Sequence, residues 1–183
     1  MSVVDAVRRR FARPPDPVRA AVSADPDERV LAWGALVGDE GWLVATSRGL
    51  RLVGPALAAG VQPWHEVGHA RWSAAGAGGT FAVTPLVDVE PGVQARGEVR
   101  RYVLAEAGNL PDVVRKRVDA TVLDSRRTAL PGGGGALLVA RRIPGQAARE
   151  WTVVFDDDAD RGDPAAREAA RAELAALVDG DQP

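Results

Sequence analysis

Between residues 28 and 105 the chain alternates short apolar segments with breaks rich in glycine and charged residues. Apolar runs of this length, bounded by turn-forming residues, are typical of β-strands. We expect six strands here, at residues 29–37, 42–47, 49–53, 67–73, 80–87 and 98–107. Strands repeated at roughly ten-residue spacing predict an antiparallel barrel or sandwich.

The hydrophobic pattern takes on the period of a helix at residues 109–118. Asn109 stands at the capping position and Pro111 in the first turn. The apolar stripe that follows is formed by Leu110, Val113, Val114 and Val118. The pattern therefore predicts a helix directly after the sixth strand.

Strand patterns return at residues 120–130, 136–143 and 150–155, and a second long helix follows them. Asp163 followed by Pro164 is a typical helix start, with a capping residue and then a proline in the first helical position. The apolar face of this helix is formed by Ala166, Ala170, Leu174 and Leu177. Strands in sequence, without regular alternation with helices, predict an α+β fold that is mainly antiparallel β.

Residues 2–12 also fit a short amphipathic helix, which the prolines of residues 13–17 would end. Its polar side is basic, with Arg8, Arg9, Arg10 and Arg13. These arginines beside few apolar residues make a weak lipid anchor. We favour docking of this segment onto the rest of the protein, or disorder, over contact with a membrane surface.

Composition excludes several classes of function. The 183 residues carry a net charge of −2, so no overall positive field attracts nucleic acid, and the chain contains no cysteine for disulfides or thiolate chemistry. No apolar run has the length of a membrane span, and the first residues lack the apolar core of a signal peptide. We expect a cytoplasmic protein. All but one of the 23 basic residues are arginine, as codon bias in a high-GC bacterium would produce.

One stretch, "QPWHEVGHARW", contains the spacing of a zinc peptidase. His65 and His69 would lie one turn apart on a helix, and Glu66 could activate a metal-bound water. A third ligand would have to be a carboxylate such as Glu90, because the chain has no other histidine. The motif makes a zinc-dependent hydrolase the alternative hypothesis for function.

The residues around the motif favour a strand over a helix. Pro63 precedes His65 by two positions and Gly68 lies between the histidines, and both weaken a helix there. On a strand, Gly68, Ala70 and Trp72 would face one way, and the opposite face would carry Val67, His69, Arg71 and Ser73. The conformation of residues 63–73 therefore separates the two hypotheses.

Two other patterns invite a ligand but favour turns. Asp156, Asp158 and Asp160 have the spacing of a calcium loop, but Arg161 and Arg167 replace its glycine and its bidentate glutamate. We interpret this segment as an acidic turn ahead of a helix. The glycine runs "AGAGG" and "PGGGG" lack the order of phosphate-binding loops, so we expect hairpin turns.

The segment from about residue 26 to residue 120 resembles the bacterial PH-like domain. The resemblance rests on the hairpin Ala45-Thr46-Ser47-Arg48-Gly49-Leu50, on Pro63, Trp64 and Val67 in the following extended segment, and on the helix "LPDVVRKRV". It implies a partly open β-barrel plugged by a helix and used for binding. A complete barrel of this kind has seven strands, one more than we count.

PH domains that bind inositol phosphates hold them with basic residues between the first two strands. Asp39 and Glu40 occupy the matching turn here, which argues against a phosphoinositide ligand. The resemblance thus favours binding of a protein or peptide.

Together these observations predict a basic helix and linker at 1–25, a PH-like barrel with its capping helix at 26–120, and a three-stranded plus helix extension at 121–183. The function that we expect is a non-enzymatic binding or protein-interaction module. Its partner would be a peptide, another protein or a second copy of the chain. We expect no cofactor, no nucleic acid and no integral membrane association, and no residue is assigned to a catalytic, cofactor or metal site.

Overall fold

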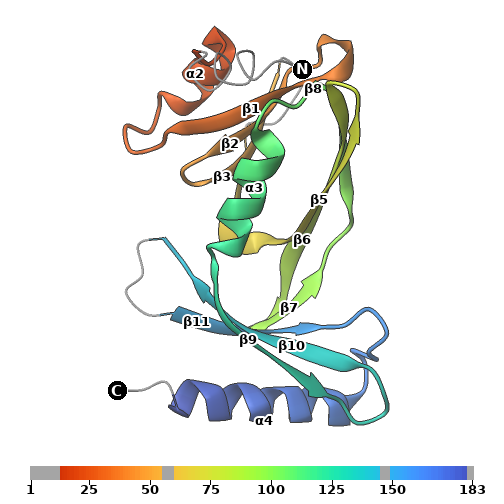
Figure 1. The fold of residues 1–183 in the computed structure, drawn as a ribbon. Coiled ribbons are helices and arrows are strands. Elements are labelled where there is room, and N and C mark those ends of the chain that lie inside the picture. Colours follow the sequence, from red (N-terminus) through yellow and green to blue (C-terminus); the bar gives the residue numbers. More distant parts are fainter. Residues whose placement is uncertain (1–12, 55–59, 145–148, 181–183) are drawn as a thin grey trace. The chain divides into compact units, whose positions relative to one another are not determined.

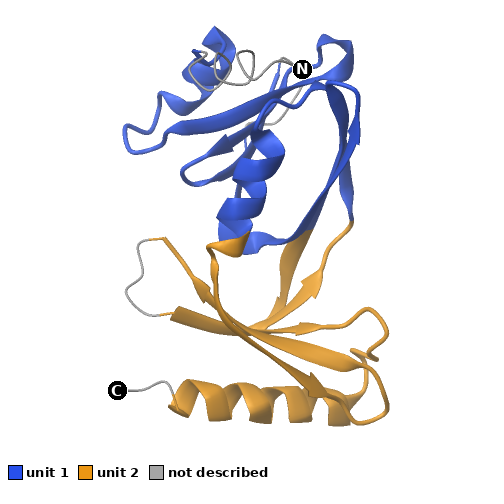
Figure 2. Cartoon of the chain, in the orientation of Figure 1, with its two compact units in different colours: residues 1–84, 99–118 blue, residues 85–98, 119–183 orange. Residues whose placement is uncertain are grey.

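The computed structural model describes residues 13–54, 60–144 and 149–180. The chain divides into two compact units, which Figure 2 colours separately. Unit 1 contains residues 1–84 and 99–118, and unit 2 contains residues 85–98 and 119–183. The helix expected at residues 2–12 lies outside the described residues.

The sheet of unit 1 contains seven described strands: β1 (Val30–Leu36), β2 (Trp42–Thr46), β3 (Gly49–Val53), β4 (Val61–Pro63), β5 (Val67–Ala75), the first part of β6 (Gly78–Glu90) and β8 (Arg100–Glu106). Their order across the sheet is β4-β3-β2-β1-β8-β6-β5 (Figure 1). Every neighbouring pair from β4 to β6 is antiparallel. The terminal strands β4 and β5 do not pair with each other, so the sheet is not closed into a barrel.

All six strands that the sequence predicts before residue 109 are present. Two further strands were missed, β4 and β7 (Val93–Arg96). Both are too short to show an alternating pattern, since they have three and four residues. The short helix α2 (Asp16–Val22) was missed as well, because a proline in the first turn of a helix is tolerated although it reads as a break in the sequence.

Helix α3 (Leu110–Asp119) covers the core of unit 1. Leu110 and Val114 are completely buried, and they pack with Leu43, Trp64, Phe81 and Leu104 of the sheet. Burying a leucine or valine in this way contributes about 1.5–3 kcal/mol. The apolar stripe predicted for residues 109–118 is therefore the stripe that holds the helix on the sheet.

Unit 2 is a second sheet in the order β6-β7-β11-β10-β9, with β9 (Val122–Ala129), β10 (Gly135–Arg142) and β11 (Arg149–Phe155). β7 and β11 pair in parallel, and the other neighbours are antiparallel. Helix α4 (Pro164–Gly180) packs against this sheet through the four residues that the sequence predicts, Ala166, Ala170, Leu174 and Leu177. The end of β6 together with β7 thus enlarges the expected three strands to a sheet of five.

The predicted start of α4 is confirmed. The Asp163 carboxylate accepts a hydrogen bond from the N–H of Ala165 at 3.0 Å. Such a cap satisfies one of the free N–H groups at a helix start.

Candidate functional site

The HEVGH motif does not lie on an α-helix. His65 and Glu66 belong to the single 3-10 turn η2 (Trp64–Glu66), and His69 lies on β5. The strand predicted for residues 67–73 is confirmed, and the helical geometry that the zinc hypothesis requires does not form. Within the residues that the structure describes, no three histidine or acidic side chains cluster as metal ligands would.

The two carboxylates of the zinc hypothesis, Glu66 and Glu90, have protein partners, whereas the buried Nδ1 of His65 has no hydrogen-bond partner among the described residues. Glu66 accepts a hydrogen bond from the side-chain amide of Gln62 at 2.9 Å, and Gln62 in turn accepts one from Arg100 at 3.3 Å. Glu90, the proposed third ligand, is bonded to Arg167 at 2.8 Å, and its pKa is lowered chiefly by that hydrogen bond. These carboxylates serve as acceptors for local donors.

The two faces of β5 follow the prediction with one exception. Ala70 and Trp72 pack against the core of unit 1, whereas His69, Arg71 and Ser73 are exposed. Val67 was expected on the exposed face but is completely buried. It directly follows the η2 turn, and its N–H bonds the carbonyl of Trp64, so the turn rather than strand alternation directs its side chain.

The residues that carry the PH-like resemblance meet at the β2–β3 hairpin. The Thr46 hydroxyl accepts hydrogen bonds from the N–H groups of Arg48 and Gly49, both at 3.1 Å, and so closes the turn. Gly49 has no room for a side chain, since an added Cβ would lie 2.2 Å from the carbonyl oxygen of Gln62. Trp64, only 3% exposed, donates its indole N–H to the Thr46 carbonyl at 3.0 Å. Thr46 and Trp64 therefore join β2, β3 and η2.

A buried ion pair lies beside this hairpin. Glu28, whose side chain is fully buried, faces the guanidinium of Arg51 on β3, with Nε to Oε1 at 2.9 Å and Nη2 to Oε2 at 2.5 Å. The Thr46 hydroxyl also donates to Glu28 at 2.6 Å. Burial by itself raises the pKa of Glu28, but the hydrogen bonds from Arg51 and Thr46 outweigh it and keep the pKa below its ordinary value.

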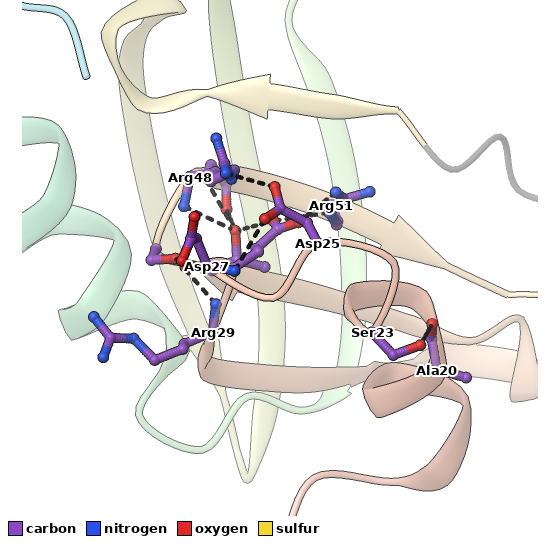
Figure 3. Close-up of polar contacts among 11 residues, drawn as sticks. Ala20, Ser23, Asp25, Asp27, Arg29, Arg48 and Arg51 are labelled. Atoms are coloured by element: carbon purple, nitrogen blue, oxygen red, sulfur yellow. Dashed lines mark hydrogen bonds and ion pairs between the residues drawn. The ribbon is translucent and has the colours of Figure 1, made fainter. Parts of the chain in front are cut away.

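An outer ion pair extends the cluster (Figure 3). Asp25, in the segment after α2, lies 2.6 Å from Arg48. A hydrogen bond from the N–H of Asp27 is the main reason why the pKa of Asp25 is lowered. Because each charged group here has a partner within unit 1, we assign the cluster to holding the hairpin in place.

The candidate binding site is a small pocket between β5, β6 and α3. It has a volume of about 200 Å³ and is lined by Ala70, Trp72, Phe81, Pro111, Asp112 and Arg115. The rings of Trp72 and Phe81 lie 5.9 Å apart and form an apolar wall. Pockets for small molecules usually enclose about 300–1,000 Å³. The pocket thus suits one side chain rather than a whole metabolite.

The other patterns noted in the sequence are turns. Asp156 pairs with Arg127 at 2.9 Å, and Asp160 accepts the N–H of Gly162 at 2.8 Å. The glycine runs join β5 to β6 and β9 to β10, and Gly76 and Gly132 have positive φ angles that favour glycine. Asp39 and Glu40 lie exposed between β1 and β2.

Comparison with known proteins found no matching family model, no matching curated protein and no matching solved structure. Among the described residues, no helix combines the length and the apolar character that crossing a bilayer requires. The case for a function therefore depends on the geometry of unit 1.

Proposed function

We propose that unit 1 is a PH-like binding module that holds an extended peptide along the free edge of β5. One apolar side chain of the peptide would enter the pocket between β5 and α3. The observation that carries this proposal is that the longest free edge among the described strands of unit 1 borders a pocket with an aromatic wall.

The backbone of β5 offers the first half of such a site. Among the described strands β5 pairs only with β6, and it is nine residues long, whereas the opposite edge strand β4 has three. A free edge presents N–H and C=O groups that an added strand can bond. Hydrogen bonds of this kind supply affinity independent of the peptide sequence.

The pocket offers the second half, because it can select a side chain. Trp72 and Phe81 form its wall, and Ala70 leaves space above the strand. Aromatic residues that surround a small desolvated pocket are typical of the few positions that dominate binding energy. We therefore expect the peptide to carry an aromatic or large aliphatic residue at one position.

The charges around the pocket indicate the character of the rest of the peptide. On α3 three exposed side chains are basic, Arg115, Lys116 and Arg117, whereas two are acidic, Asp112 and Asp119. Asp112, which lies 3.6 Å from Arg115, is the acidic residue of the pocket lining. This excess of positive charge favours a partner with acidic residues beside its apolar anchor.

The fold supports a PH-like assignment, which remains part of the proposal. Seven described strands followed by a helix on the sheet match the arrangement that the resemblance implies. The exposed acids Asp39 and Glu40 oppose an inositol phosphate ligand at the β1–β2 turn. A peptide therefore suits the charges of unit 1 better than a phosphoinositide does.

The test is selection from a random peptide library on the whole protein, followed by measured affinities. We expect the selected peptides to share one aromatic or large aliphatic position and to shift the amide resonances of β5. Ala70→Phe should fill the pocket and weaken binding by about 2 kcal/mol, or roughly thirtyfold. The matched control is Ala105→Phe, at an exposed position of β8. Peptides that bind Ala70→Phe unchanged, or that shift residues away from β5 and α3, would contradict the proposal.

A further inference from the structure

Unit 2 has a free strand edge of its own. Among the described strands β9, which has eight residues, pairs only with β10, and the register of this pair shifts at Leu123. Two large apolar side chains on this strand are exposed, Val122 at 38% and Leu123 at 43%. Long free edges of this kind lead to association unless they are covered or protected.

The backbone at the centre of β9 faces that free edge. The N–H of Ser125 bonds the carboxylate of Asp124 at 2.7 Å, although Ser125 lies opposite Val139 of β10. In an antiparallel ladder a residue directs its N–H and C=O to the same side. Both backbone groups of Ser125 therefore point away from β10.

The two residues that flank Ser125 carry opposite charges, so each can pair with the other residue in a second copy of the strand. Asp124 and Arg126 lie two positions apart, so their side chains share one face of the strand. Arg127 pairs with Asp156 of the same chain, whereas Arg126 has no ion pair with any acidic side chain that the structure describes. Arg126 is thus available to an acidic residue from outside.

We propose that the protein forms a symmetric dimer in which β9 pairs antiparallel with β9 of a second copy, centred on Ser125. In this register Asp124 lies opposite Arg126 of the second copy, and the pair occurs twice. The register of β9 shifts at Leu123, so the regular pairing that the proposal uses is centred on Asp124, Ser125 and Arg126.

Neighbouring registers are unfavourable. A two-fold axis requires one residue to face its own copy, because closed dimers use the same surface twice. Centring on Asp124 or on Arg126 would place like charges directly opposite each other, which is destabilising. The order Asp124-Ser125-Arg126 therefore favours the register centred on Ser125 over its two neighbours, and it favours a second copy of this chain as the partner.

The experiment measures the mass of the whole protein by sedimentation equilibrium over a range of concentrations at low salt. We expect a dimer that Asp124→Arg or Arg126→Asp weakens by about tenfold, because each single change places like charges opposite each other twice. The double variant Asp124→Arg/Arg126→Asp exchanges the two charges and should restore the dimer. Glu173→Arg on α4 changes the net charge by the same amount as Asp124→Arg and should leave the dimer intact.

A second variant tests the backbone pairing. Ser125→Pro removes an N–H that β10 does not use, so unit 2 should still fold, but the central hydrogen bonds of the dimer are lost. Circular dichroism and thermal melting check the fold of each variant. A monomer at every concentration would overturn the proposal. So would a dimer that is indifferent to Ser125→Pro and to the single charge reversals, since its interface would lie elsewhere.

Discussion

Removing Arg51 should strongly destabilise unit 1, because it leaves Glu28 buried without its charged partner. Glu28 has no exposed side-chain surface, and Arg51 is 15% exposed. Removing one member of a buried ion pair usually costs about 3–5 kcal/mol. Because water reaches part of Arg51, we expect about 3 kcal/mol for Arg51→Met, near the lower end of that range. For a unit of roughly 100 residues this corresponds to a fall in Tm of more than about 10 °C.

The pH dependence should change sign as well. In the native protein the pKa of Glu28 is below its ordinary value of 4.5. Its ionised form therefore stabilises the fold above that value, and this contribution is lost as the pH falls through the folded pKa. In Arg51→Met only burial and the Thr46 hydroxyl remain, so the pKa of Glu28 should rise above 4.5. The variant should thus gain stability as the pH is lowered from 7 toward 5.

Urea unfolding followed by tryptophan fluorescence can measure both effects. Four of the five tryptophans, Trp33, Trp42, Trp64 and Trp72, belong to unit 1. The matched control is Arg29→Met, since Arg29 adjoins Glu28 in the chain but its side chain points away from the cluster (Figure 3). The double variant Glu28→Gln/Arg51→Met should be more stable than Arg51→Met, because no buried charge remains. A loss below 1 kcal/mol for Arg51→Met, or a variant that does not gain stability as the pH is lowered from 7 toward 5, would refute this reasoning.

Two further predictions concern α4 and the HEVGH motif. Asp163→Ala removes the cap of α4 and should lower the free energy of unfolding of unit 2 by about 1 kcal/mol, as measured by thermal melting. The control Asp158→Ala, at an exposed position, should have little effect. Equal losses in the two variants would contradict the assigned cap. His69 lies on a strand and Glu66 bonds Gln62, so we expect no zinc site at the HEVGH motif. A chelator should not change the melting temperature of the protein, and elemental analysis should find no stoichiometric zinc. Zinc that is present in the native protein and lost in His69→Ala would contradict this prediction.

The local sequence pattern correctly predicted the strands and helices whose conformation is determined by residues close together in the chain. The strands around Trp33 and Val44 and the stripe Leu110–Val114 are long enough for their period to be visible, and Asp163 marks a helix start by its chemistry. Pro63 and Gly68 also led to the correct prediction that the HEVGH motif is not an α-helix. In each case the signal lies within a few neighbouring residues.

Neither the buried ion pair nor the candidate binding pocket could be predicted, because the parts of each are far apart in the sequence. Glu28 and Arg51 are separated by 23 positions, and nothing around Glu28 distinguishes it from an exposed acid. Likewise, Ala70 and Pro111 become neighbours only because α3 folds back over β5 and β6. The parallel pairing of β7 with β11 joins residues 93 and 153, which no local period reveals.

Residues 85–98 form a hairpin that belongs to unit 2, although it lies between two segments of unit 1. A single boundary at residue 120, as expected from the sequence, does not separate this hairpin from unit 1. The hairpin leaves unit 1 after Thr84, contributes Val93 to the core of unit 2, and returns at Val99. In the β6–β8 register Val83 lies opposite Arg100, which places Thr84 opposite Val99. Two residues directly opposite each other in an antiparallel pair can be joined by a two-residue turn such as Asn-Gly.

A shortened chain should therefore fold better than a simple truncation. It would join residues 1–84 to residues 99–120 through Asn-Gly, and it keeps every buried residue of the core under α3. Residues 1–120 without that deletion would retain Val93 and Ala95 but lose β11, the strand with which β7 pairs. We expect the shortened chain to unfold cooperatively, with the buried fluorescence of Trp64, and the truncation to bind more of a hydrophobic dye. If the truncation unfolds cooperatively and the shortened chain does not, then residues 85–98 belong to unit 1 energetically, and the boundary at Thr84 and Val99 is wrong.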